Sequence, residues 1–377
     1  MTRVNSWNEW DPLEHVVVGR IDSRMVGAPE AGMVLDFPRL GLGPGDWSPI
    51  PDRYIEKASE QMEGLVGLLE GRGIRVDRPT SLDDRQYVRT PDWECSHMFG
   101  TMPPRDILLC HGNTILEATM SQRARWFEFL AYRPLLERYF KEDPDFLWEA
   151  APKPRLSDES YVPGYWEGFW REWTDEQLDE RMRRYEFHLT EKEPLFDAAD
   201  AMRFGKDIFI QHSAPTNKAG LDWFKRHFES RGFRVHVLGF AGTPQPWHID
   251  VTLVPLRPGL MIVNPAYPSL VPEFLELFRM NDWEVVEAVP PSGAEQPPYS
   301  MCHESLGYNV LSLDPKTVLV EANEVRFAEQ LDGLGFDVIP VDFIDVSMFG
   351  GALHCATLDV ERDGVLEDYF PKQIPGF

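Results

Sequence analysis

A short pattern that recurs along the chain constrains the fold more than any other feature. Each copy is an apolar-periodic helix followed by an aromatic or aliphatic residue, one intervening residue and Val. Glycine after a helix favours a left-handed cap, and the short run that follows predicts a strand. The predicted helices and their strands are 62–69 with Ile74-Arg75-Val76, 221–228 with Phe233-Arg234-Val235, 274–278 with Trp283-Glu284-Val285, 327–334 with Phe336-Asp337-Val338 and, more weakly, 126–140 with Phe146-Leu147-Trp148.

Most of these helices are preceded by a predicted hairpin, because turn residues join two neighbouring apolar runs. The paired runs are 107–110 with 114–116, 202–204 with 208–210, 251–255 with 260–263, and 310–313 with 318–320. The unit is therefore strand, strand, helix, strand. It occurs about five times, in the range expected for a circular array. We predict one α/β domain over residues 1–377, built as a ring of similar modules.

A closed ring of such units has a consequence for chemistry, because equivalent loops gather at one end of the central axis. The polar residues that stand just before the first strands of their units are Asp106, Asp197, Asp200, His248, Asp250 and Cys355. We therefore expect several carboxylates, an imidazole and a thiol to meet in one pocket. Two less specific interpretations stay open: Asp200 is equally compatible with capping a turn, and Asp106 with an ion pair to its neighbour Arg105.

Two segments do not fit the repeated unit. Residues 23–51 carry many Gly and Pro residues and predict a long surface loop. Residues 161–185 hold Trp166, Trp170 and Trp173, followed by a helix that opens with Thr174 and Gln177 as a capping box. Packing of an insertion is the simpler role for these tryptophans, and a lid over the pocket is the alternative.

Composition excludes several classes of function. The formal net charge of −25 argues against a nucleic-acid partner and against an anionic membrane surface. The 4 cysteines have neither metal-ligand spacing nor a disulfide-framework pattern, which favours a reducing compartment. The N-terminus has no apolar signal region, and no run is long enough to span a bilayer. We expect a cytoplasmic protein without a nucleic-acid or membrane partner, and the sequence offers no site for a metal or an organic cofactor.

The glycine-rich stretch around Cys355 suggests the chemistry. Gly350 and Gly351 precede the thiol, and an apolar strand follows it, which is a suitable place for a nucleophile. A buried cysteine that packs as a small hydrophobe is the simpler interpretation of such a residue by itself. The carboxylates expected around it favour a cationic planar substrate, because a guanidinium offers paired N–H donors to carboxylates. Acyl transfer would instead require oxyanion donors.

The chain resembles the arginine-dependent amidinotransferases, the family of the glycine and inosamine-phosphate amidinotransferases. The matching stretches run from one end of the chain to the other in the family's order. They are Val4-Asn5-Ser6-Trp7-Asn8-Glu9-Trp10-Asp11-Pro12-Leu13-Glu14, Thr90-Pro91-Asp92-Trp93, Pro104-Arg105-Asp106, Ala151-Pro152-Lys153-Pro154, Phe196-Asp197-Ala198-Ala199-Asp200, His248-Ile249-Asp250 and His354-Cys355-Ala356-Thr357-Leu358-Asp359-Val360. The resemblance implies a five-bladed, pseudo-symmetric α/β propeller of strand-strand-helix-strand modules.

The resemblance also implies roles for individual residues. Cys355 matches the family's nucleophile, His248 its general acid–base, and Asp197 the carboxylate that orients this histidine. Asp106 and Asp250 match carboxylates that hold the substrate. Two positions depart from the family's pattern: His303, with Cys302, stands where glycine amidinotransferase has two serines, and Tyr267 where the relatives have an arginine for the substrate carboxylate.

The resemblance therefore implies that the chain moves the amidino group of L-arginine to a primary amine through an amidino-cysteine and releases ornithine. The departure at Tyr267 favours an amine of a secondary-metabolite pathway over glycine as acceptor. Two alternatives stay open: a guanidine hydrolase of the arginine deiminase type, and a non-catalytic binding protein for a guanidino compound. Two-fold homodimers are the commonest oligomers of soluble proteins, and a homodimer is expected here on that ground alone.

Overall fold

The repeated unit predicted from the sequence is present in the computed structural model of the chain. The structure describes residues 2–22, 25–26, 48–166, 173–240, 242, 247–265, 271–300, 302 and 304–374. Within them lie five three-stranded sheets with the same topology, in which the first two strands are antiparallel and the last two are parallel. The predicted α/β composition and the order of elements in the unit are confirmed.

Four of the sheets are formed by continuous stretches of chain. The first unit consists of β7 (Leu108–His111), β8 (Thr114–Glu117), α4 (Phe129–Glu142) and β9 (Leu147–Ala150), and the second of β10 (Ala201–Phe204), β11 (Asp207–Gln211), α6 (Lys218–Glu229) and β12 (Arg234–Leu238). The third consists of β13 (Leu253–Arg257), β14 (Leu260–Val263), α7 (Pro272–Met280) and β15 (Glu284–Glu287). The fourth consists of β16 (Leu311–Asp314), β17 (Thr317–Glu321), α8 (Val325–Gly333) and β18 (Asp337–Val341).

The remaining sheet joins the two ends of the chain. Its first strand is β19 (Thr357–Arg362), which pairs antiparallel with β1 (Leu13–Val18); β1 in turn pairs parallel with β4 (Arg75–Asp77) after the helix α2 (Asp52–Gly71). Contacts run from β19 to β7 on one side and from β1 to β16 on the other. The sheet therefore links the first and the last of the continuous units.

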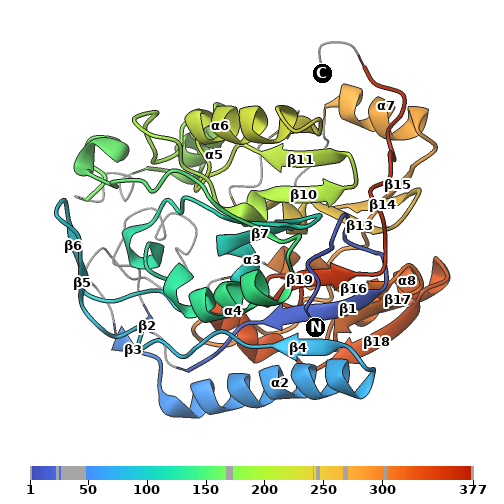
Figure 1. The fold of residues 1–377 in the computed structure, drawn as a ribbon, viewed down its shortest axis with the longest axis horizontal. Coiled ribbons are helices and arrows are strands. Elements are labelled where there is room, and N and C mark those ends of the chain that lie inside the picture. The colour runs from blue at the N-terminus through green and yellow to red at the C-terminus, as the bar shows by residue number, and fades with distance from the viewer. Residues whose placement is uncertain are drawn as a thin grey trace.

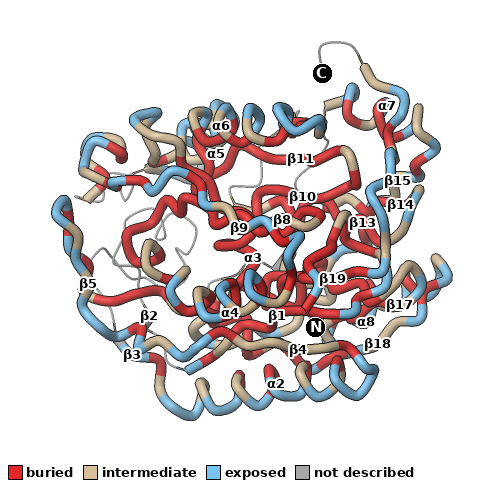
Figure 2. Tube along the Cα trace, in the orientation of Figure 1, coloured by how far each residue is buried: buried red, intermediate tan, exposed pale blue. Residues whose placement is uncertain are grey.

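The helices α2 and α6 lie outside the sheets of their units, on opposite sides of the molecule (Figure 1). The strands are largely buried and the helices expose their outer faces (Figure 2). Three of the helices end with glycines in the left-handed region, at Gly73, Gly232 and Gly335, as the pattern predicts. After α7 a non-glycine residue, Asp282, takes this place with φ 62°.

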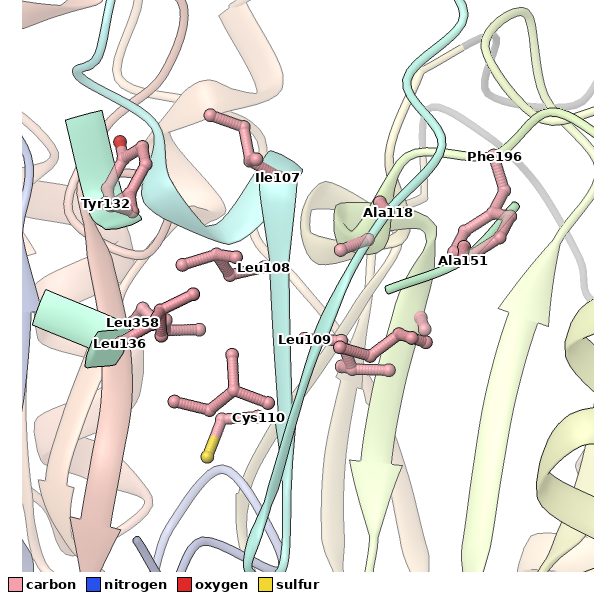
Figure 3. Packing of buried hydrophobic residues seen from close by; sticks show 14 of the residues in the cluster. Ile107, Leu108, Leu109, Cys110, Ala118, Tyr132, Leu136, Ala151, Phe196 and Leu358 are labelled. Atoms are coloured by element: carbon pink, nitrogen blue, oxygen red, sulfur yellow. The ribbon is translucent and has the colours of Figure 1, made fainter. Parts of the chain in front are cut away.

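Apolar clusters connect neighbouring units. In one of them, Leu108 of β7 packs with Leu358 of β19 and with Tyr132 and Leu136 of α4 (Figure 3). Cys110 belongs to the same cluster, and burial raises the pKa of its thiol to about 12. Cys110 is therefore a buried structural thiol. Packing of this kind fixes the ends of the first strands relative to one another.

The two segments outside the repeated unit are described only in part. Within residues 23–51, the strands β2 (Met25–Val26) and β3 (Ser48–Pro49) pair antiparallel, and residues 23–24 and 27–47 lie outside the described residues. In the second segment the predicted capping box of Thr174 and Gln177 is present at the start of α5 (Asp175–Arg183). Trp166 and Trp173 pack against the buried pair Tyr161 and Tyr165, whereas Trp170 lies outside the described residues.

The remaining regular elements are short. They are β5 (Val88–Arg89), β6 (Glu94–Cys95), α3 (Pro104–Ile107) and the 3₁₀ helices η2 (Arg123–Arg125), η3 (Asp158–Ser160), η5 (Ala198–Asp200), η6 (Ile249–Val251), η7 (Glu304–Tyr308) and η8 (Ile344–Phe349). None of the helices in the described part of the chain is long and apolar enough to cross a bilayer.

Candidate active site

The residues that precede the first strands converge, as the ring arrangement predicts. Asp106 lies in α3 before β7, and Asp197 directly precedes η5 and β10. His248 directly precedes η6 and β13. A carboxylate oxygen of Asp106, a carboxylate oxygen of Asp197 and a ring nitrogen of His248 all lie within 4.8 Å of one another. Three separate units therefore supply one carboxylate–imidazole cluster, and the same side chains are the described residues best placed to hold a metal ion.

His248 lies between two carboxylates. Its Nε2 is 3.3 Å from Oδ2 of Asp197, and its Nδ1 is 3.7 Å from Oδ1 of Asp106. The backbone of His248 adopts φ 38° and ψ 140°, which is a strained conformation for a residue with a Cβ. Such strain persists only where the surrounding structure enforces it, and here it aims the ring at the two aspartates.

A buried arginine that the sequence analysis did not identify balances part of this charge. Arg125 Nη1 donates to Oδ2 of Asp106 at 2.8 Å and lies 3.7 Å from Oδ2 of Asp197, while its Nε donates to Glu128 at 3.0 Å. Oδ1 of Asp106 is buried, has no hydrogen-bond partner among the described residues, and faces Nδ1 of His248 at 3.7 Å. One oxygen of Asp106 is therefore held by Arg125, while the other keeps the capacity to accept a hydrogen bond.

The second half of the site is built around the thiol of Cys355. Its Sγ lies 3.2 Å from Oδ2 of Asp250, which is also 2.9 Å from Nδ1 of His354. Asn309, another residue that the sequence analysis missed, donates from Nδ2 to the same carboxylate oxygen at 2.7 Å. All four side chains are buried. The thiol is thus held against a carboxylate whose other contacts are hydrogen-bond donors.

Asp106 and Arg105 do not form the ion pair that was the simpler alternative for Asp106. Arg105 instead donates to Glu9 at 3.2 Å and to Asp359 at 2.9 Å, within a buried ionic cluster that also contains Arg203. Neighbouring residues on a short helix face different directions, and the two side chains separate accordingly. Asp106 faces His248 and Arg125, so its location matches the site interpretation.

Asp200 is a third carboxylate close enough to His248 to act on its charge. Its Oδ2 accepts from Ser213 at 2.6 Å and from Thr216, and it also helps to raise the pKa of His248. Burial raises the pKa of Asp200 itself to about 7, against the opposing effect of His248. Its side chain therefore connects η5 to the loop between β11 and α6, and it also contributes to the field at His248.

The two positions that depart from the family's pattern, Tyr267 and His303, lie outside the described residues. Their neighbour Cys302 is described and is half-buried. Its Sγ is 3.3 Å from the carbonyl oxygen of Ser347, and its thiol is one of the groups that raise the pKa of Cys355. Cys302 therefore belongs to the surroundings of the site.

The pKa of the Cys355 thiol and the pKa of the His248 imidazole are both shifted by the surrounding groups. Burial, with Asp250 and Asp106, raises the pKa of Cys355 well above its ordinary value. Burial opposes the positive charge of His248, but Asp106, Asp197 and Asp200 outweigh it and raise its pKa to about 10. For Asp250, burial is outweighed by His354 and His248, and its pKa falls to about 2. These shifts favour a neutral thiol, an imidazolium and an ionised Asp250 at neutral pH.

We expect the ring of His248 to stay protonated at neutral pH and to titrate near pH 10. Because this pKa exceeds the ordinary value of 6.5, the stability that the charged ring contributes is complete below pH 6.5 and is lost as the pH rises toward 10. The measurement is a ring-proton NMR titration, with the signal assigned by its absence in His248→Asn. Buried His188, whose pKa is lowered to about 4, is an internal reference that stays neutral. A His248 signal that titrates near 6.5 would contradict this assignment.

Comparison with known proteins places the chain in a family. A scan against protein-family models gives no match. The mitochondrial glycine amidinotransferase of Xenopus tropicalis is 38% identical over 372 residues, which cover 97% of this chain and 85% of the relative. The L-arginine:L-lysine amidinotransferase of Pseudomonas savastanoi pv. phaseolicola is 36% identical over 373 residues, covering 97% of this chain and 96% of the relative. This chain belongs to the amidinotransferase family.

Solved structures agree with this placement. An amidinotransferase of the saxitoxin biosynthetic pathway from Microseira wollei superimposes on this amidinotransferase with a TM-score of 0.83 at 36% identity, covering 97% of this chain and 99% of the other. The inosamine-phosphate amidinotransferase of Streptomyces griseus gives a TM-score of 0.81 at 32% identity, with coverage of 98% and 100%. A dimethylarginine dimethylaminohydrolase at 17% identity and a TM-score of 0.54 shares the fold.

Proposed function

We propose that this amidinotransferase transfers the amidino group of L-arginine to an acceptor primary amine through a covalent amidino-Cys355 intermediate and releases L-ornithine. The observation that carries the proposal is the approach of Cys355 Sγ to Asp250, at 3.2 Å, beside the cluster of His248, Asp106 and Asp197. A guanidinium can bridge these carboxylates because it presents paired N–H donors on a plane.

The first half-reaction follows from the charges of the site. Entry of the arginine cation beside Asp250 and Asp106 offsets the negative charge that keeps the thiol protonated, and the thiol proton leaves to water. The thiolate of Cys355 attacks the guanidinium carbon, and an S–C bond forms. The bond from this carbon to the ornithine nitrogen then breaks, and that nitrogen takes a proton from His248.

The carboxylates around His248 prepare it for this proton transfer. Asp106, Asp197 and Asp200 raise its pKa to about 10, so the ring carries the proton that a departing amine needs. A general acid works best when its pKa lies near the working pH, and an arginine cation bound beside Asp106 would lower the pKa of His248 toward that range. His248 can therefore protonate the departing ornithine and later accept a proton from the attacking acceptor amine. In that second half-reaction the acceptor forms the new C–N bond, the S–C bond breaks, and the thiolate returns.

The fold supports this proposal through the position of each group. We propose that the five sheets are the blades of a single α/β propeller domain, with the site at the end where the first strands begin. Contacts from β19 to β7, from β7 to η5, from η5 to η6, from η6 to η7 and from β1 to β16 support a closed ring. A nucleophile on one blade and its acid–base on another then face each other across the axis.

For the acceptor, we propose an amine of a secondary-metabolite pathway. Two solved structures that this chain resembles carry names from such pathways, since one belongs to saxitoxin biosynthesis and the other is an inosamine-phosphate amidinotransferase. Tyr267 stands in the sequence where the resemblance places an arginine for the substrate carboxylate. A site without that cation would favour an acceptor that has no carboxylate.

The proposal is tested by intact-mass spectrometry of the protein after incubation with L-arginine alone, together with an ornithine assay. We expect a mass gain of one amidino group, mapped by peptide analysis to Cys355, and one ornithine per adduct. Cys302→Ser is the matched control, because it removes a neighbouring thiol and should leave the adduct in place. A panel of amines that includes glycine and L-lysine should then discharge the adduct selectively.

A guanidine hydrolase is the second candidate, favoured by the shared fold of the dimethylarginine dimethylaminohydrolase. In that case water takes the place of the acceptor amine. Continuous release of citrulline or ammonia from arginine, without a guanidinylated acceptor, would replace the transferase proposal with this one. Absence of both adduct and product would reject arginine as the donor.

A further inference from the structure

Asn309 occupies the one first-strand position for which the sequence analysis named no site residue. It lies between η7 and β16, in the unit that follows the one of His248 and Asp250. The other four units contribute Asp106, Asp197, Asp250 or Cys355 from the equivalent place. Asn309 is 2% exposed, so its amide group has no access to bulk water and must be satisfied within the protein.

The hydrogen bonds of the Asn309 amide determine its orientation. Its Oδ1 accepts from the backbone N–H of His354 and from that of Cys355, both at 3.0 Å. A backbone N–H can only donate, so the oxygen must face the Cys355 loop and the NH₂ group must face the opposite side. There Nδ2 donates to Oδ2 of Asp250 at 2.7 Å and to Sγ of Cys355 at 3.3 Å. All the hydrogen-bonding capacity of the NH₂ group is directed at the nucleophile and its carboxylate neighbour.

We propose that Asn309 is a further catalytic residue of this enzyme: its Nδ2 donates a hydrogen bond to the sulfur of Cys355 and stabilises the thiolate, while the same group holds Asp250. The proposal rests on the amidino transfer proposed above. It deepens that proposal by naming the donor that the nucleophile uses after it loses its proton.

The contacts of the sulfur show why such a donor is needed. In the thiol form, Sγ–H donates to Asp250 and the sulfur accepts from Asn309. Loss of the proton places a thiolate against an ionised carboxylate, an arrangement that repels. Hydrogen bonds that involve a charged partner are the stronger kind, so the contribution of Asn309 grows as the negative charge forms.

Titratable groups face the sulfur from several elements. Asp250 from η6, Asp106 from α3 and the thiol of Cys302 raise the pKa of Cys355, whereas His248 and His354 counter the charge of Asp250. Asn309 is neutral at every pH, so its contribution lowers the pKa of the thiol without adding a titration of its own. Replacement of Asn309 should therefore move the pH profile of Cys355 alkylation to higher pH without changing the shape of the profile.

The test measures the reactivity of Cys355 without arginine. The rate of alkylation by iodoacetamide is followed against pH, and peptide mapping separates Cys355 from Cys302. Asn309→Asp keeps the size and the acceptor oxygen, and Asn309→Ser removes the NH₂ group without adding a charge. For both variants we expect alkylation of Cys355 to slow by about 10- to 100-fold at a given pH, the usual worth of a hydrogen bond to a charged group.

Asn217 provides the matched control. It is also a buried asparagine whose Oδ1 accepts from two backbone N–H groups and whose Nδ2 donates twice, but its partners are Gly220 in the first turn of α6 and backbone groups of residues 190–195. Asn217→Asp and Asn217→Ser should lower thermal stability and leave the alkylation profile of Cys355 at the wild-type position. If Asn309→Asp does not fold, the neutral variant Asn309→Ser carries the comparison with its Asn217 counterpart.

Each result decides the proposal. Slower alkylation in both Asn309 variants, with an upward shift of the pH profile, supports it. Wild-type alkylation in a folded Asn309→Ser variant overturns it, as does slowing in Asn309→Asp alone, because added negative charge would then be the cause. The amidino-transfer proposal is tested separately by the arginine adduct of the wild-type protein. Slow alkylation in the variants without any wild-type adduct would therefore reject the transfer and keep Asn309 as the donor to the thiolate.

Discussion

Cys355→Ser is expected to abolish ornithine release while arginine still binds. A serine hydroxyl is a far weaker nucleophile than a thiolate at any accessible pH, and Asp250 beside it disfavours ionisation further. Removal of an enzyme nucleophile typically costs on the order of 10⁴–10⁶-fold in turnover. The carboxylates that we assign to guanidinium binding are unchanged by the substitution. Calorimetric titration with L-arginine and a discontinuous ornithine assay measure the two effects separately.

The adjacent thiol is the control for this experiment. Cys302→Ser alters a half-buried side chain that also influences Cys355, and it should retain ornithine release and the arginine adduct. Turnover by Cys355→Ser near the wild-type rate would exclude covalent catalysis through this residue. Loss of arginine binding together with turnover, in a variant that folds normally, would show that the thiol holds the substrate rather than reacting with it.

Local patterns in the sequence were sufficient to predict the modular fold. Helices, caps and hairpins each depend on residues close together in the chain, so they leave a readable signal. The glycines at Gly73, Gly232 and Gly335 marked three helix ends correctly. At the fourth end the left-handed residue is Asp282, which has no such signature. The pairing of β19 with β1 involves the two ends of the chain, and the sequence supported it only through the need to close a ring.

The position of site residues was predictable because it follows from the repeat. Asp106, Asp197, His248 and Cys355 all stand just before a first strand. Asn309 has the same signal, since it directly precedes the predicted strand at Val310, but an asparagine was not sought where carboxylates and nucleophiles were expected. Arg125 has no comparable signal. It lies between a strand and a helix, and its role depends on Asp106 at the start of its own unit and on Asp197 in the next unit.

The buried ionic cluster between Glu9 and the first strands could not be predicted at all. Glu9 accepts from Nε and Nη2 of Arg203, each at 2.6 Å, and from Arg105 at 3.2 Å. Its Oε2 also lies 3.3 Å from Nε2 of His354, the neighbour of Cys355. These partners are separated from Glu9 by 96, 194 and 345 residues along the chain, and no local pattern reports such a pairing. The cluster connects the N-terminal segment, two units and the loop of Cys355.

Glu9→Gln is expected to lower the free energy of unfolding by about 3–5 kcal/mol, the usual cost of removing one partner from a buried ion pair. The variant keeps the shape of the side chain but leaves Arg203 and Arg105 with Asp359 as their shared carboxylate. Urea denaturation at neutral pH measures the change. Glu14→Gln is the control, because Glu14 is exposed and its replacement should move the midpoint little.

The pH dependence separates a charge effect from a packing effect in Glu9→Gln. Burial would raise the pKa of Glu9, but Arg203, Arg105 and His354 outweigh it and hold the pKa well below the ordinary value of 4.5. The stability contributed by the ionised carboxylate is therefore complete above pH 4.5 and is lost as the pH falls through the depressed pKa. The difference between wild type and Glu9→Gln should shrink on acidification. A difference in the free energy of unfolding that stays constant at all pH values would assign the loss of stability to packing alone. The loop of Cys355 would then not depend on the charge of Glu9.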